Sequence, residues 1–452
     1  MTQHFAPLVQ RIAGEGSDAW VTHYEAWAAR EQGADVILLS VGDPDLATPA
    51  PVVERAVEQL RAGDTHYTPS TGRLHLREAI AAQHRQRYGQ AVGPDNVVLL
   101  SGAQNALFAT SLCIAGEGDE LVVLDPMYAT YPATVEVSGA KMVRAGTSAA
   151  CGFRPDLDRL ARAITPRTRG ILFSTPSNPS GVILNDREID AIGELARRHD
   201  LWVIADQVYA GLAPTGRVPS LASRLPDQVI TIGSLSKSHS MPGWRIGWLI
   251  GPTSLVGHVD HLAMCMLFGL PGFVQEAGVT ALGMAEEAEG RVRDYCARRC
   301  ELLREELTGI PGLVCHVPEA GMFMLVDISG TGMTGRQFMR ALYEAEGVSV
   351  LDGGVFGRDT AGVVRICFAV EEQTIEDACR RIRRFVEAML RHLEDVGGIQ
   401  HAHVVHHEAA RCDADGETLA SHQPLLQLGP RHGLRVQEPL RVVAGHLAQP
   451  RG

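Results

Sequence analysis

The chain has 452 residues, of which 45% are hydrophobic and 21% charged, and its formal net charge is −12. This length and balance indicate a folded protein of two or three domains and exclude a largely disordered chain. The acidic charge, without a block of Lys or Arg, argues against nucleic acid or an anionic membrane as a partner, and no apolar run approaches the roughly 18 residues of a membrane span.

The N-terminus and the cysteines indicate the compartment. Residues 1–16 are polar and lack the basic and then apolar pattern of a secretory signal. The nine cysteines are scattered and form no Cys-x-x-Cys pair. Cys296 and Cys300 lie four residues apart on an expected helix, where free thiols are favoured over a metal pair. We therefore expect a cytoplasmic protein without a bound metal.

Short apolar segments alternate with helical ones between about residues 96 and 251. The expected strands are rich in Val, Ile or Leu: Val97–Leu100, Leu121–Leu124, Lys141–Val143, Gly170–Phe173, Trp202–Ala205, Val229–Ile232 and Ile246–Ile250. Helical spacing is found at Asn105–Ala115 and Asp186–His199. Such short apolar runs suit strands that are buried on both faces. The alternation predicts an α/β fold with a mostly parallel sheet and helices on both faces.

The pattern changes after about residue 290. A charged helix is expected at Arg291–Leu307, strands at Met322–Val326 and Val363–Phe368, and a helix at Ile375–Leu393. These elements predict a smaller α+β domain. We expect a large domain at 52–288, the small domain at 289–396 and an N-terminal segment at 1–51 that packs with the small domain.

The last part of the chain, residues 397–452, differs from the rest. It holds seven of the eighteen histidines and shows weak hydrophobic periodicity. This composition is typical of a poorly ordered tail, and a metal-binding tract is the alternative.

The most specific chemistry follows the strand at Val229–Ile232. The run reads Ser234-Leu-Ser-Lys237-Ser-His-Ser-Met-Pro-Gly-Trp-Arg245-Ile-Gly247. A lysine between small residues can condense with an aldehyde if its surroundings keep the amine partly neutral. Ser234, Ser236 and Arg245 can hold a phosphate, Arg245 through its fork of donors. A surface turn with a solvated lysine is the alternative reading of these residues alone.

This run resembles the lysine signature of the class I and II aminotransferases. The resemblance implies the fold type I architecture, with a seven-stranded sheet in the large domain, and pyridoxal phosphate bound covalently to Lys237. It also implies an enzyme that moves an α-amino group from an amino acid to a 2-oxo acid by a ping-pong mechanism, with Lys237 as base and acid.

Two segments resemble the parts of the family that surround the cofactor's phosphate and ring. Gly102-Ala103-Gln104 ends a strand and opens a helix, where backbone N–H groups attract phosphate. The resemblance implies that this loop cradles the cofactor's phosphate. It also implies that Tyr128, in Asp125-Pro-Met-Tyr128, stacks on the pyridine ring.

Two more segments resemble the polar partners of the ring. Asp206 ends a strand, at the sheet edge where α/β proteins bind ligands, and can pair with the pyridine nitrogen. The resemblance implies that Tyr209 and Asn178, the latter in Asn178-Pro-Ser-Gly181, bond the phenolic oxygen. Gln207 stands where the family usually has Glu, which does not affect the pyridine contact.

Three further matches imply a substrate site and a homodimer. Tyr67, in Tyr67-Thr-Pro-Ser-Thr-Gly72, matches the tyrosine that reaches the phosphate of the neighbouring subunit, so the active sites would be shared. Arg365 matches the arginine that grips the substrate's α-carboxylate, with Asn178 beside it. The backbone of Gly42, in Gly42-Asp-Pro-Asp45, would line the substrate site.

Within the family, several stretches most resemble the bacterial arginine–pyruvate transaminases. They are Arg11–Gly16, Ala19–Trp20, Leu39–Asp45, Ser234–Trp248 and Leu262–Phe268. Pro242 replaces the threonine usual in the fourth of them. An arginine substrate would need acidic or carbonyl groups for its guanidinium, and Glu15 and Asp18 are candidates.

Two other functions remain open from the sequence. β-Lyases and other amino-acid enzymes share this scaffold, and a fold does not fix a function. Ligand-sensing regulators also contain such domains, but they carry a basic N-terminal domain for which the family pattern leaves no room here.

Overall fold

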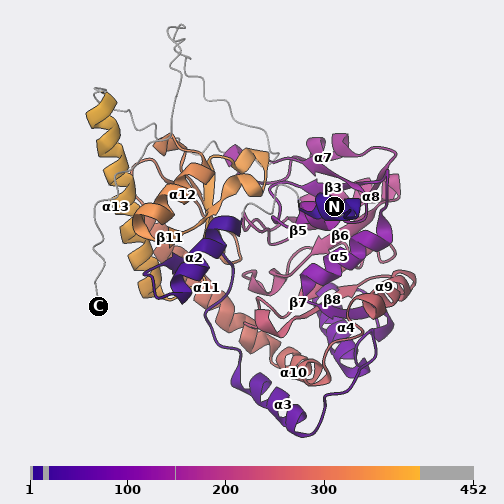
Figure 1. Ribbon diagram of the computed structural model, residues 1–452. Helices are drawn as coiled ribbons and strands as arrows, with labels where there is room; N and C mark the ends of the chain where they lie inside the picture. Colours follow the sequence, from indigo (N-terminus) through magenta and orange to yellow (C-terminus); the bar gives the residue numbers. More distant parts are fainter. Residues whose placement is uncertain (1–3, 14–19, 148, 398–452) are drawn as a thin grey trace.

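The computed structural model describes residues 4–13, 20–147 and 149–397. Residues 398–452, which make up almost all of the expected tail, and the candidates Glu15 and Asp18 lie outside these ranges. Within the described ranges, none of the helices combines the length and apolar composition that a membrane crossing needs. Two domains lie side by side in Figure 1, with the larger one to the right.

A seven-stranded sheet forms the centre of the large domain, as predicted. Its strands are β2 (Val97–Ser101), β3 (Glu120–Leu124), β4 (Lys141–Ala145), β5 (Thr168–Ser174), β6 (Trp202–Asp206), β7 (Val229–Ser234) and β8 (Ile246–Ile250). They run in the order β2-β8-β7-β6-β5-β3-β4. Only β8 is antiparallel to its neighbours. Every expected strand is therefore present, most of them longer than predicted by one or two residues.

Helices cover both faces of this sheet because its strands are apolar on both sides. In β2, Val98 and Leu100 pack with the helices of one face, whereas Val97 and Leu99 belong to a separate core on the other. The covering helices are α4 (Leu74–Tyr88), α5 (Ala103–Ile114), α6 (Tyr131–Glu136), α7 (Leu157–Ala163), α8 (Asp186–His199), α9 (Thr253–Met266) and α10 (Gly272–Gly283). The α/β prediction is confirmed, and the double burial explains why the strands do not alternate in polarity.

The small domain is built on a four-stranded antiparallel sheet. Its strands are β9 (Val314–His316), β10 (Phe323–Asp327), β12 (Leu351–Asp352) and β13 (Val363–Cys367), in the order β12-β13-β10-β9. Its helices are α12 (Gly335–Glu346) and α13 (Glu372–Gly397). The helix α11 (Ala285–Leu307) contacts both the large domain, at residues 210–212, and α13. The helix begins six residues before the predicted start at Arg291. The prediction missed this part because the first turn is acidic and carries little apolar periodicity.

The N-terminal segment reaches both domains (Figure 1). The helix α1 (Pro7–Ile12) contacts α6 of the large domain. The helix α2 (Val21–Glu31) contacts α12, and β1 (Ile37–Leu38) pairs in parallel with β11 (Val348–Ser349). The next helix, α3 (Ala50–Arg61), packs on α10. The chain before residue 50 therefore connects the two domains next to the ends of the sheet strands.

Candidate active site

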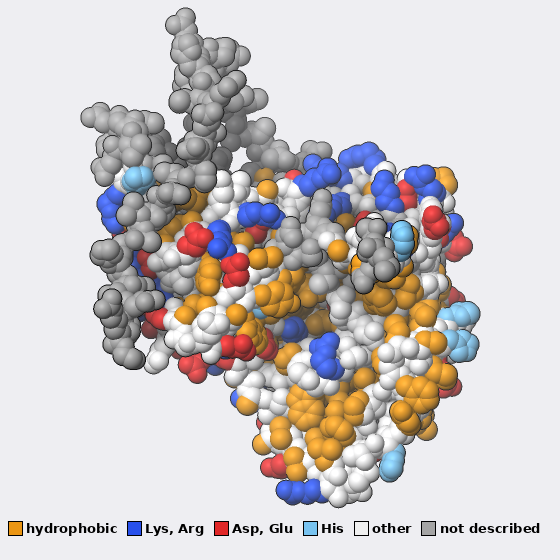
Figure 2. Space-filling view, in the orientation of Figure 1, with side chains coloured by type: hydrophobic (Ala, Val, Ile, Leu, Met, Phe, Trp, Pro, Cys, Tyr) orange, Lys and Arg blue, Asp and Glu red, His pale blue; other side chains and the backbone are white. Residues whose placement is uncertain are grey.

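The candidate residues of the large domain gather at one edge of the seven-stranded sheet. Parallel strands deliver their carboxyl ends to the same edge, and the antiparallel β8 starts there. The residues that follow a parallel strand, or precede β8, are Gly102, Ala103, Gln104, Tyr128, Asn178, Asp206, Tyr209, Ser234, Ser236, Lys237 and Arg245. The small domain brings Arg365, on β13, to the same place, where it bonds Asn178. Figure 2 shows Lys or Arg side chains inside the hollow between the two domains.

Lys237 is partly buried, and its amine bonds a neutral backbone oxygen. Its Nζ donates a hydrogen bond to the backbone oxygen of Gly42, so it contacts the predicted substrate loop directly. Burial lowers the pKa of Lys237, and the negative charge of Asp43 opposes this shift in part. Desolvation favours the uncharged form of an amine. Lys237 is thereby prepared to act as a nucleophile and as a base.

Asp206 is a buried carboxylate held by neutral donors. The hydroxyl of Tyr131 donates to Oδ2 at 2.7 Å, and the backbone N–H of Val208 donates to Oδ1 at 3.2 Å. Burial raises the pKa of Asp206, and both hydrogen bonds lower it. None of the cationic side chains in the described ranges forms an ion pair with this carboxylate. A protonated ring nitrogen is a fitting partner for such an acid.

The start of α5 forms a cradle for an anion. Gly102 precedes the helix with a φ of +80°, and a Cβ at Gly247 would overlap the backbone of Gly102 and Ala103. The first N–H groups of a helix have no partner within it and attract phosphate. The guanidinium of Arg245 lies against Gly102 and donates to the backbone oxygen of Ser101 at 3.0 Å. At the end of β7, Ser234 Oγ accepts a hydrogen bond from the N–H of Ser236 at 2.8 Å.

Gln104 contributes its backbone to this cradle and not its side chain. Its amide donates to Thr134 Oγ1 and accepts from Thr130 Oγ1, each at 2.7 Å. The side chain therefore fastens α5 to the start of α6. The sequence did not indicate that these threonines are its partners.

Arg365 is almost fully buried and is held only by neutral groups. Its Nη1 donates to Asn178 Oδ1 at 2.8 Å and its Nη2 to the backbone oxygen of Ser40 at 2.6 Å. The rings of Phe323 and Phe356 lie 3.9 and 4.8 Å from its Cζ. Burial lowers the pKa of Arg365 to about 10, so it is charged at neutral pH. A guanidinium has five N–H donors, and those that remain, including the buried Nε, suit a carboxylate.

Two tyrosines complete the walls. Tyr209 is buried with its ring 6.1 Å from that of Phe323, and burial raises its pKa. Tyr128 meets Tyr131 edge to face, with the ring centroids 5.8 Å apart. The charges of Arg365 and Asp206 act on the pKa of both Tyr128 and Tyr209, so the two phenols lie near these groups.

Tyr67 is the one predicted site residue that the chain does not bring to this place. It is 87% exposed and contacts Phe268, with the ring centroids 4.8 Å apart. The two rings line a surface cavity of about 420 Å³ between residues 65–68 and 268–273. This position suits a residue that reaches outward.

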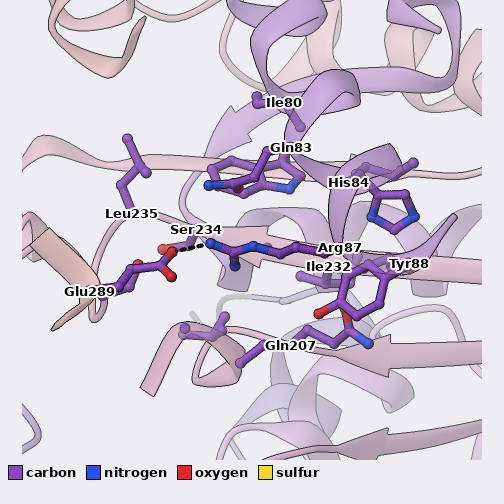
Figure 3. Close-up of a pocket in the computed structure, with 18 of the residues that line it drawn as sticks. Ile80, Gln83, His84, Arg87, Tyr88, Gln207, Ile232, Ser234, Leu235 and Glu289 are labelled. Atoms are coloured by element: carbon purple, nitrogen blue, oxygen red, sulfur yellow. Dashed lines mark hydrogen bonds and ion pairs between the residues drawn. The ribbon is translucent and has the colours of Figure 1, made fainter. Parts of the chain in front are cut away.

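A separate polar cavity of about 40 Å³ lies behind the loop that carries Lys237 (Figure 3). In Figure 3, Arg87 of α4 extends between Gln83 and Gln207 towards Glu289 of α11, with which it forms an ion pair of 2.5 Å. His239 and Gln207 also line the cavity. Burial lowers the pKa of His239 to about 4, so its ring is neutral at pH 7. Polar groups thus support the back of the lysine loop.

Sequence reasoning missed Tyr131 and the carbonyl of Ser40, and it placed the backbone of Gly42 at the substrate site without foreseeing its bond to Lys237. Tyr131 follows Tyr128 by three residues and received no role, although its hydroxyl bonds Asp206. The carbonyls of Ser40 and Gly42 bond Arg365 and Lys237, and a carbonyl carries no side-chain signal. Only the proximity of Gly42 to the expected substrate site pointed to that loop.

The surroundings fit the pyridoxal phosphate that the resemblance implies. An amine of lowered pKa suits its aldehyde, the cradle at Gly102 with Arg245 suits its phosphate, and Asp206 suits its protonated ring nitrogen. The side-chain amide of Asn178 can serve two partners. Its Oδ1 accepts from Arg365, and its Nδ2 can donate to the phenolic oxygen of the cofactor.

Comparisons with known proteins agree with this geometry. Residues 34–382 match the family model for aminotransferases of class I and II. The chain is 44% identical over 380 residues to a Pseudomonas aeruginosa protein named arginine–pyruvate transaminase, covering 84% of this chain and 97% of that protein. It is 33% identical to an aspartate/prephenate aminotransferase of Thermus thermophilus, covering 80% and 93%. A solved structure of the Thermus thermophilus aspartate aminotransferase with maleate has a TM-score of 0.80 at 32% identity, covering 85% of this chain and 100% of that one.

Proposed function

Because the chain belongs to the class I and II aminotransferases, we propose that it takes the α-amino group of L-arginine and passes it to pyruvate. The general activity follows from the family: the protein is a pyridoxal-phosphate-dependent aminotransferase that acts on amino acids and 2-oxo acids. The observation that supports arginine is the 44% identity to the Pseudomonas aeruginosa enzyme over 97% of its length.

The bound cofactor supplies an aldehyde that takes up the substrate's amino group and a ring that accepts the electron pair of the α-carbon. In our proposal, Lys237 holds the aldehyde at rest. The N–H of Gly102 is engaged with the backbone oxygen of Leu100 at 2.7 Å, so the backbone N–H groups of Ala103 and Gln104 would hold the phosphate, together with Ser234, Ser236 and Arg245. Tyr128 would stack on the pyridine ring.

Arg365 binds the substrate's carboxylate with its remaining N–H donors. Its buried charge costs free energy when it is unpaired, so an arriving carboxylate is bound strongly. The two aromatic rings and the carbonyl of Ser40 fix the plane of the guanidinium. This fixed plane orients the α-carbon, whose proton must point towards Lys237.

Lys237 Nζ would then take the proton from the α-carbon as a general base and deliver it to the cofactor's C4′ carbon as a general acid, and the second half of the transfer runs the same steps in reverse. Its lowered pKa keeps a neutral fraction available for the first task. Asp206 stays ionised through its hydrogen bonds and keeps the ring nitrogen protonated. Asn178 and Tyr209 donate to the phenolic oxygen. Ping-pong kinetics are expected, since one site serves both substrates in turn.

We further propose a homodimer in which Tyr67 reaches the phosphate in the neighbouring subunit. Tyr67 points to solvent in the single chain, next to Phe268. Figure 2 shows hydrophobic side chains gathered where α3 and α10 lie in Figure 1. Large exposed apolar residues include Val53, Val57 and Leu60 on α3. An apolar patch rimmed by polar residues is typical of a protein interface. The cytoplasmic location and the domain limits at 51, 288 and 396 remain predictions from the sequence.

A donor screen on the purified holoenzyme tests the arginine proposal. With pyruvate as acceptor, we expect kcat/KM for L-arginine to exceed that for aspartate and phenylalanine by at least about tenfold, the effect of a single matched charge pair. Lysine and citrulline serve as controls for charge and for shape. Equal values for all donors, or no turnover of arginine, would contradict the proposal and leave the aminotransferase activity unaffected.

A further inference from the structure

The buried guanidinium of Arg365 depends on the backbone of Ser40 for its orientation. No carboxylate in the described ranges pairs with it, and its two hydrogen bonds go to Ser40 O and Asn178 Oδ1. Hydrogen bonds from a charged donor are strongly directional, so the position of the Ser40 carbonyl sets where Nη2 points. Whatever holds Ser40 therefore also positions Arg365.

The side chain of Ser40 is held by two other buried residues. Its Oγ lies 2.8 Å from Nδ1 of His23 and 3.0 Å from Oγ of Ser349. All three side chains are buried, with exposures of 5% or less. They come from α2, from the end of β1 and from β11, so the cluster joins three separate segments of the chain.

The surroundings favour neutral His23. Ser349 Oγ donates to Ser40 Oγ, which leaves the Ser40 proton free to point at Nδ1 of a neutral His23 ring that carries its proton on Nε2. Burial lowers the pKa of His23, and the positive charge of Arg365 lowers it further. The His23 ring also meets Trp20 and Trp27 edge to face, at 5.8 and 5.7 Å. The ring is thus fixed from both sides.

We propose that His23 is a positioning residue that, through Ser40, aligns Arg365 for the α-carboxylate of both the amino acid and the 2-oxo acid. His23 does not touch the substrate. It links α2 to the site that recognises the feature common to all substrates. The inference rests on the proposed role of Arg365 in binding that carboxylate.

Two substitutions separate the hydrogen bond from the bulk of the ring. In His23→Asn the amide takes the place of Nδ1 and can keep the contact with Ser40, whereas in His23→Gln it takes the place of Nε2 and loses it. His84 is the matched control. It is equally buried on α4 and bonds Gln90 through Nε2 at 2.7 Å, in a part of the fold that has no contact with Arg365.

Each holoenzyme is tested with an amino acid and with the amine that lacks only its carboxylate: arginine with agmatine, and alanine with ethylamine. The rate constant of the first half-reaction is measured for each. We expect His23→Gln to lower the ratio of amino acid to amine about tenfold, mainly through KM, because a charged hydrogen bond is misaligned. His23→Asn should stay within about threefold of the wild type, and KM for the 2-oxo acid should follow the same order.

His84→Asn and His84→Gln should leave the ratio of amino acid to amine unchanged, even where they lower the melting temperature. If His23→Gln lowers the rates with amino acid and amine equally, or matches His84→Asn, the positioning role is wrong. Arg365→Gln provides the reference. If it also leaves the ratio unchanged, the carboxylate role of Arg365 itself is wrong, and the inference about His23 is overturned with it.

Discussion

The hydroxyl of Tyr131 lies 2.7 Å from Oδ2 of Asp206 and donates a hydrogen bond to it. The tyrosine is fully buried at the start of α6, and the aspartate ends β6. Burial raises the pKa of Asp206, and this bond acts in the opposite direction. Tyr131 therefore helps to keep a charge in a place that disfavours it.

Tyr131→Phe should reduce catalysis by weakening that charge. Without the hydroxyl, the pKa of Asp206 rises further, so a larger fraction is protonated and holds the ring nitrogen less well. A hydrogen bond to a charged group contributes about 1.5–3 kcal/mol, so kcat should fall by about ten- to a hundredfold. The acid limb of the pH profile should also move to higher pH. Tyr88→Phe, at the end of α4, is the control. An unshifted profile in Tyr131→Phe would contradict the role.

Lys237→Ala should abolish transamination, because the base and the attachment point are lost together. A loss of at least about a thousandfold is expected for a general base in such a site. Borohydride reduction followed by peptide mass spectrometry should find the cofactor on the peptide that contains Lys237 in the wild type only. Cofactor attached to another lysine in the wild type would refute the assignment.

His239 should make the fold sensitive to acid. Its pKa is about 4 in the folded protein, against an ordinary value near 6.5. Below pH 6.5 the unfolded chain takes up a proton that the folded chain refuses, so stability falls as the pH falls towards 4. Between pH 7 and pH 5 this amounts to about 2 kcal/mol.

His239→Gln removes this titration. The drop in denaturation midpoint between pH 7 and pH 5 should be smaller for this variant than for the wild type. His258→Gln, at an exposed position on α9, should retain the full drop. An equal drop in all three proteins would count against a neutral buried His239.

Gly181 should tolerate no side chain. Its φ is +72°, and a Cβ there would overlap Pro318 and the backbone oxygen of Ala320, where the two domains meet beside Asn178. Gly33 has a φ of +86° but open space around it. Gly33→Ala should therefore cost only the conformational strain, about 1–2 kcal/mol, and Gly181→Ala about 1–3 kcal/mol more. Melting temperatures and KM values check this. If Gly181→Ala and Gly33→Ala are destabilised equally, Pro318 and Ala320 have moved to make room for the added methyl group, and the prediction is wrong.

The parts of the fold that sequence predicted are those with local signals. The range Asp186–His199, predicted from helical spacing, matches α8, which begins after a capping box of Asn185 and Glu188 and ends where the chain turns left-handed at Asp200. The strands were found because each is a continuous apolar run between turns. By contrast, β1 and β11 are only two residues long, and their pairing joins segments that no local pattern connects.

The candidate site shows the same division. Lys237, Asp206 and Asn178 follow strands whose carboxyl ends meet, so their proximity could be expected. The hydrogen bonds of Arg365 to Ser40 and of Lys237 to Gly42 could not, because the acceptors are main-chain oxygens distant in sequence. Gln104 was placed correctly at the start of α5, yet its amide is engaged with Thr130 and Thr134.

The reversed direction of β8 brings its start to the sheet edge at which β7 ends. Lys237 follows β7 and Arg245 directly precedes β8, so one short connection holds both residues at the same edge of the sheet. In our proposal these two residues hold the two ends of one small molecule, Lys237 its aldehyde and Arg245 its phosphate. The antiparallel pairing of β7 with β8 would therefore set the distance between the two binding residues within a single segment of the chain.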